Sequence, residues 1–111
     1  MLHKVILAAC LVFFASSAFA SGATVAVYEG QYFYNFENAI ITPKGGNECW
    51  AIKGDLSAAE LPGKNGAPPW GTADVVVRGV LSPKGHYGNL GACTHQIAVL
   101  EVLKIANRQQ R

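Results

Sequence analysis

Methionine and charged side chains are scarce in this chain of 111 residues. Its one methionine is the initiator, so no thioether ligand for copper follows it. Nine basic residues stand against seven acidic ones, and the basic residues are scattered instead of forming a stripe. Because a clustered basic stripe is the electrostatic footprint of a nucleic-acid binder, the composition argues against a nucleic-acid partner.

A hydrophobic run long enough to span a membrane is also missing. Val5–Phe14 is uncharged, but a membrane-spanning helix needs about 20 apolar residues. Small residues follow and end in Ala18, Phe19 and Ala20, a pattern that suits signal peptidase. We predict a signal peptide over residues 1–20, cleaved after Ala20, and one domain over residues 21–111 with no membrane span.

An uncleaved anchor and a lipid on Cys10 are the alternatives. The four residues that end in Cys10 resemble a bacterial lipobox, in which the cysteine is lipidated. Only about five apolar residues would precede it, which is short for a signal core, and the residues after it are apolar where a soluble tether is expected. Cleavage after Ala20 is therefore preferred. It predicts a periplasmic or secreted protein and leaves the choice between the two open.

Cleavage would leave two cysteines, Cys49 and Cys93, in a domain of about 90 residues. A lone pair in a small exported domain most often forms a disulfide. The bridge would close a loop of about 45 residues and contribute roughly 4 kcal/mol in the chain-entropy model. Free or metal-binding thiols are the alternative.

Alternating and β-branched residues predict a mainly β domain. Thr24–Thr42 is rich in Val, Ile, Tyr and Phe, its aromatic residues alternate, and Gly30 would let a long strand bend. Further strands are predicted over Glu48–Ile52, Ala73–Ser82 and Thr94–Ile105. The last segment could also be a helix, but its β-branched content favours a strand.

One short helix is expected where Ser57 and Glu60 have the spacing of a capping box. Segments rich in proline and glycine, Pro43–Asn47 and Lys64–Gly71, mark a turn and an exposed loop. Four or five strands with one helix between the third and the fourth indicate a small β-barrel. The OB type is the nearest match in size and order, and a β-sandwich is the alternative.

A pattern of glycine, aromatic and other residues in this chain resembles that of a group of uncharacterised exported bacterial proteins. The matching pattern comprises Gly30, Tyr32, Tyr34, Phe36, Glu37, Trp50, Val77-Arg78-Gly79, Leu81-Ser82-Pro83, Gly85, Tyr87-Gly88 and Leu90-Gly91-Ala92. That group looks OB-like and is faintly similar to the barrel half of some envelope-stress lipoproteins. The resemblance implies the fold and carries no known catalytic residues.

The segment richest in potential chemistry is Ser82–His95. Its glycines have the spacing of neither a P-loop nor a dinucleotide site, so a connection between strands is expected. His86, Cys93 and His95 could ligate zinc or copper, but a bridged Cys93 has no thiolate and no fourth ligand is evident nearby. No cofactor is predicted, and His86 and His95 remain weak metal candidates.

The domain has more aromatic side chains than one small core can hold. They are Tyr28, Tyr32, Phe33, Tyr34, Phe36, Trp50, Trp70 and Tyr87. Trp70 and Tyr87 lie in predicted loops, and with His86 they form the candidate ligand-binding surface, because OB-type barrels bind along a face flanked by loops. The alternative is that Trp70 covers one end of the barrel.

The acidic residues are scattered and follow no catalytic motif, so no enzymatic activity is predicted. We expect a non-catalytic secreted or periplasmic module of the bacterial envelope, with a structural role or a binding role toward an unknown protein or glycan. A metal-handling protein that uses His86 and His95 is the alternative. A small hydrolase is a weaker one, which a pair of carboxylates in one cleft would support.

Overall fold

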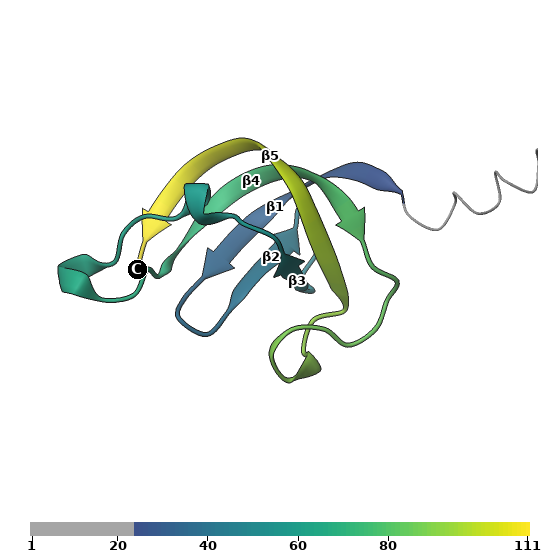
Figure 1. Cartoon of the computed structure of the whole chain (residues 1–111), viewed down its shortest axis with the longest axis horizontal. Helices are drawn as coiled ribbons and strands as arrows, with labels where there is room; N and C mark the ends of the chain where they lie inside the picture. Colours follow the sequence, from purple (N-terminus) through teal and green to yellow (C-terminus); the bar gives the residue numbers. More distant parts are fainter. Residues whose placement is uncertain (1–23) are drawn as a thin grey trace, which may run out of the picture.

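The computed structural model describes residues 24–111; the predicted signal peptide, its cleavage site after Ala20 and Cys10 lie outside them. This part is mainly β and forms one sheet of five strands (Figure 1). The strands are β1 Val25–Tyr34, β2 Ala39–Pro43, β3 Trp50–Lys53, β4 Gly71–Leu81 and β5 His95–Gln110. No helix within residues 24–111 is long and apolar enough to cross a membrane.

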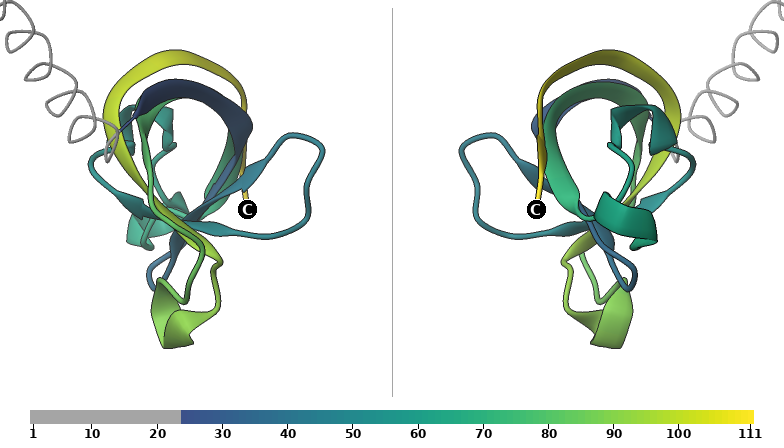
Figure 2. Two further views of the ribbon diagram at one scale, coloured as in Figure 1. Left: turned by 90° about the vertical axis from the view of Figure 1, so that its right-hand side faces the viewer. Right: turned by 90° about the vertical axis from the view of Figure 1, so that its left-hand side faces the viewer.

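The strands pair in a closed ring in the order β1-β2-β3-β5-β4, and β4 returns to β1. Every pair is antiparallel except β3 with β5, which is parallel. Figure 2 shows the sheet curling round on itself. One sheet closed in this way agrees with the OB-type barrel predicted from the sequence and differs from the two packed sheets of a sandwich.

β1 closes the ring because it pairs on both of its sides. Its whole length pairs with β4, and its second half, from Gly30 onward, also pairs with β2. Gly30 is buried, and a Cβ atom there would collide with the Thr42 carbonyl oxygen and lie 2.8 Å from Ile41 Cγ2. A glycine is therefore required for β2 to approach β1 this closely.

The strand predicted over Thr24–Thr42 is in fact a hairpin of two strands. Asn35 makes the turn, since its Oδ1 accepts hydrogen bonds from the backbone N–H groups of Glu37 (2.9 Å) and Asn38 (2.7 Å). This is the turn that an Asn side chain commonly stabilises. The prediction missed it because Phe36 continues the aromatic alternation of the strand into the turn.

The inward side chains of all five strands form one core. Its buried members are Tyr32, Tyr34, Ile41, Trp50, Leu56, Ala59, Ala73, Val75, Val77 and Ile97. Tyr28 packs its ring against Trp50 in an edge-to-face arrangement, with the ring centroids 5.4 Å apart. Aromatic rings therefore supply much of the buried apolar area of this small barrel.

The helix predicted at Ser57 is a single 3₁₀ turn, Ser57–Ala59, and the predicted capping box is wrong. The Ser57 backbone N–H donates to Asp55 Oδ1 at 2.8 Å. The Glu60 carboxylate instead accepts a hydrogen bond of 2.5 Å from the Tyr32 hydroxyl. Burial, together with Glu60, raises the pKa of the Tyr32 phenol, so Tyr32 remains a donor and ties this segment to the core.

The last strand is confirmed as a strand and is longer than predicted. β5 continues past Ile105 to Gln110, and its register against β4 shifts at three places. Two of these places leave Leu100 and Leu103 as the extra residues on β5, and both are exposed. Such irregularities bend a strand and help it to wrap around a barrel.

The predicted disulfide between Cys49 and Cys93 is confirmed. It joins the residue before β3 to the loop between β4 and β5, beside the place where Trp50 and His95 begin the parallel pairing. The backbone N–H of Thr94 donates to the Cys49 carbonyl oxygen at 3.1 Å. The bridge therefore fastens the one parallel pair of the ring.

We predict that the Cys49→Ala/Cys93→Ala variant loses roughly 4 kcal/mol of unfolding free energy, because the unfolded chain is no longer closed into a long loop. Urea unfolding followed by tryptophan fluorescence measures the loss. Wild-type protein in reductant controls for the substitutions themselves. Equal midpoints for the variant and the oxidised wild type would contradict the stabilising role of the bridge.

Gly30→Ala is expected to destabilise the fold by about 1–3 kcal/mol, because the added methyl group collides with the backbone of β2. Gly46→Ala is the matched control, since the nearest atom to its Cβ is Pro43 Cγ at 3.3 Å, a contact that can relax. Thermal unfolding of both variants compares them. The requirement for glycine is wrong if the two melt at the same temperature.

Candidate functional site

The structure does not bring the three predicted surface residues together. Trp70 directly precedes β4, whereas His86 and Tyr87 lie in the loop that follows it. β4 has 11 residues, a length that corresponds to roughly 33 Å of extended chain. Figure 1 shows these two loops at opposite ends of the barrel.

Trp70 forms an apolar notch with the loop between β1 and β2. Phe36 is 77% exposed and Trp70 is 50% exposed, so both rings face solvent. The notch has a volume of about 150 Å³ and is lined by Asn35, Phe36, Ala67, Pro68, Pro69 and Trp70. This volume is well below that of pockets for drug-sized ligands, so the notch suits one side chain or one sugar ring.

Both walls of the notch are held in place by hydrogen bonds. Asn35 fixes the loop that carries Phe36, as described above. On the other wall, the backbone N–H of Arg111 donates to the Trp70 carbonyl oxygen at 2.8 Å. The side chain of Gln110 also donates to the Pro62 carbonyl oxygen. Together with the fixed φ angles of Pro68 and Pro69, these bonds hold both walls of the notch in place.

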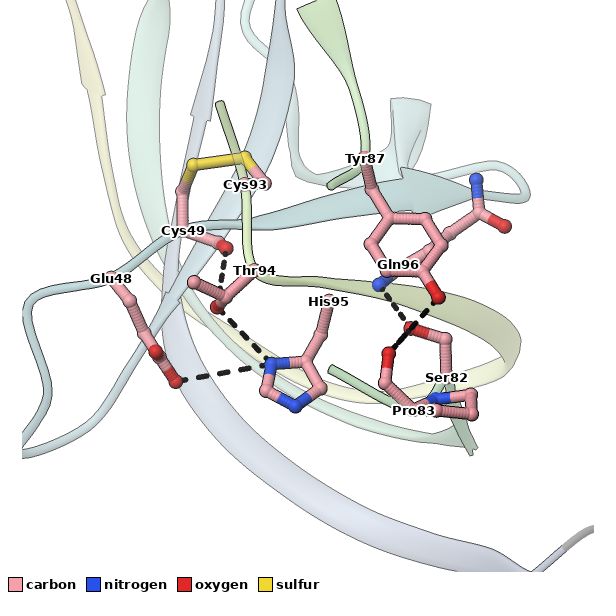
Figure 3. A network of polar contacts seen from close by, with 9 residues as sticks. All are labelled: Glu48, Cys49, Ser82, Pro83, Tyr87, Cys93, Thr94, His95 and Gln96. Atoms are coloured by element: carbon pink, nitrogen blue, oxygen red, sulfur yellow. Dashed lines mark hydrogen bonds and ion pairs between the residues drawn. A yellow bond between two sulfur atoms is a disulfide. The ribbon is translucent and has the colours of Figure 1, made fainter. Parts of the chain in front are cut away.

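Tyr87 serves mainly as a brace in the loop at the other end. It is half-buried, and its hydroxyl donates to the Pro83 carbonyl oxygen at 3.0 Å (Figure 3). Its backbone also pairs with Cys93. Tyr87 is therefore less available to a ligand than its place in a loop suggested, while His86 beside it is exposed.

His95 lies close to an acid and a hydroxyl but does not form a hydrolytic triad. Its Nδ1 atom is 3.1 Å from Thr94 Oγ1 and 3.9 Å from Glu48 Oε2 (Figure 3). A triad requires the nucleophile on one ring nitrogen and the acid on the other. Here both groups face the same nitrogen, so Thr94 is not set up as a nucleophile.

The described residues offer no set of side chains that could hold a metal ion together with His86 or His95. Within the described part of the chain, no group of three or more His, Cys, Asp or Glu side chains gathers around one point. Cys93 is bridged to Cys49 and has no thiolate to offer. Residues 24–111 therefore give His86 and His95 no third ligand of the kind that a protein zinc site needs.

The comparisons provide no relative for this chain: no family model, no curated protein and no solved structure matches it. Its class is defined by the fold and the site alone. It is a disulfide-bonded, five-stranded β-barrel with a preorganised apolar notch at one end.

The two tryptophans provide a test of this geometry. Trp70 is half exposed and Trp50 is only 7% exposed, so iodide in solution should quench the fluorescence of Trp70 alone. Trp70→Phe is expected to remove the quenchable component, and Trp50→Phe is expected to leave it. Quenching that survives in Trp70→Phe would place that ring away from the surface.

Proposed function

We propose that this protein is a non-catalytic binding module exported from a bacterial cell, and that the notch between Phe36 and Trp70 takes an apolar side chain of a protein partner. The observation that carries the proposal is a pair of solvent-facing aromatic rings on a preorganised apolar notch. Rigid aromatic anchors contribute a large share of the affinity in protein interfaces.

The composition of the notch favours a polypeptide over a glycan. Of the residues that line it, none is charged, and the only polar side-chain groups are the Asn35 amide and the Trp70 indole N–H. The Oδ1 atom of Asn35 already accepts two backbone hydrogen bonds. A sugar ring would present hydroxyl groups that find few partners here and would lose hydrogen bonds to water. A proline or aliphatic side chain loses none.

The disulfide supports the exported location. Disulfides persist in oxidising compartments such as the bacterial periplasm and the extracellular space, and they are rare in the cytosol. Cys49 and Cys93 fasten the barrel, so an oxidising environment stabilises the folded state. This agrees with the signal peptide predicted over residues 1–20.

Selection from a random nine-residue peptide library displayed on phage tests the proposed function. The full chain is expressed with residues 1–20, so that it can be exported and oxidised, and the exported protein is immobilised as wild type, Phe36→Ser/Trp70→Ser or Leu90→Ser. Leu90 is the matched control because it is 98% exposed and lies at the opposite end of the barrel. Peptides selected on the wild type should bind Leu90→Ser equally and the double variant at least about tenfold more weakly.

Two results would contradict the proposal. One is a selection that enriches either no peptide or only peptides that bind the double variant as well as the wild type. The other is binding of soluble peptidoglycan fragments that requires Phe36 and Trp70, which would replace the polypeptide partner by a glycan. Circular dichroism should show the double variant folded, because exposed substitutions of this kind usually change stability by less than about 0.5 kcal/mol.

A further inference from the structure

A second, larger hollow, here called the polar groove, lies on the outer face of β1. It has a volume of about 490 Å³, and Glu29, Gln31, Thr42, Lys44 and Asp74 surround it above the backbone of Gly30. Gly30 itself faces the core, because a Cβ atom there would lie 2.8 Å from Ile41 Cγ2. Charged and polar side chains line the hollow together with Pro43, in contrast to the mainly apolar notch.

The strand register places these polar side chains in one row. Gln31 lies directly opposite Thr42 on β2 and opposite Asp74 on β4. Residues directly opposite each other in antiparallel strands share a face of the sheet, so the three side chains are neighbours. Asn107 on β5 extends the row, because its side-chain amide donates to Asp74 Oδ2 at 2.7 Å.

The polar groove and the apolar notch are two ends of one face. Side chains of a strand alternate, so Glu29, Gln31 and Phe33 all project outward from β1. Asn35, the next residue in this series, lines the notch. Gln31 and Asn35 are four positions apart, which corresponds to roughly 13 Å of extended chain. A bound polypeptide in extended form would cover this distance with about four residues.

The groove has an excess of negative charge. It contains the carboxylates of Glu29 and Asp74 and the ammonium group of Lys44. Glu29 pairs with Lys44 at 3.5 Å. The Asp74 carboxylate accepts a hydrogen bond from the neutral amide of Asn107. Both members of the Glu29–Lys44 pair are exposed, and an ion pair of this kind contributes little. Lys44 can therefore give way to a cation from a ligand, and Asp74 has no cationic partner among residues 24–111.

We propose that the partner is an extended polypeptide segment that places an apolar side chain in the notch and a lysine or arginine about four residues away in the groove. This inference rests on the proposed function, because it assigns a second subsite to the same surface. Charge complementarity carries it: the groove offers Glu29 and Asp74 to a cation, and the notch offers only apolar contact.

The same phage library, selected on Glu29→Gln/Asp74→Asn, tests the second subsite. Peptides selected on the wild type should combine a proline or aliphatic residue with a lysine or arginine about four positions away. Peptides selected on the variant should keep the apolar residue and lose the basic one. Those selected on the wild type should bind the variant roughly fivefold more weakly, as expected for an exposed ion pair.

Glu48→Gln/Glu101→Gln is the matched control, because it removes two exposed carboxylates outside the groove. It should leave both the selected pattern and the affinity unchanged. A wild-type selection that enriches only the apolar residue, with equal affinity for the groove variant, overturns the second subsite and leaves the notch standing. Loss of the basic preference in the control as well would also overturn it, because the effect would then come from net charge alone.

Discussion

The double pairing of β1 is the constraint on which the rest of this molecule depends. A strand that pairs along its whole length with β4 and, from Gly30 onward, also with β2 closes the sheet and leaves a single core. It also fixes which side chains face outward, because a slip of one residue would exchange the two faces. The groove lies on the outward face of this strand, and the notch begins where the strand ends.

The two ends of the barrel differ in how their side chains are arranged. At one end, the disulfide, Tyr87 and the beginning of β5 form a cross-braced loop in which the polar groups mostly satisfy one another. At the other end, Phe36 and Trp70 are held firmly by their backbones while their rings face solvent. Rigid positioning combined with exposed apolar surface is what we expect of the proposed binding surface.

Local sequence signals predicted the strands after residue 43, the disulfide and the OB-type order, because these depend on short-range alternation and on a lone pair of cysteines. These signals failed where a residue far away in the sequence determines the local structure. Glu60 has capping-box spacing, but it bonds to Tyr32, which is 28 residues away. The sequence marks Trp70 as a candidate for the binding surface, but it predicts a strand at its partner Phe36. Only the closed ring brings these two loops together.

The proton–proton contacts of Gln31, measured by nuclear magnetic resonance on the isotope-labelled protein, test the double pairing of β1 most directly. The register of β1 predicts short backbone contacts from Gln31 to Thr42 on one side and to Asp74 on the other. Contacts shifted by one residue on either side would contradict it. They would turn Gln31 and Phe33 toward the core and break the outward face that joins groove and notch.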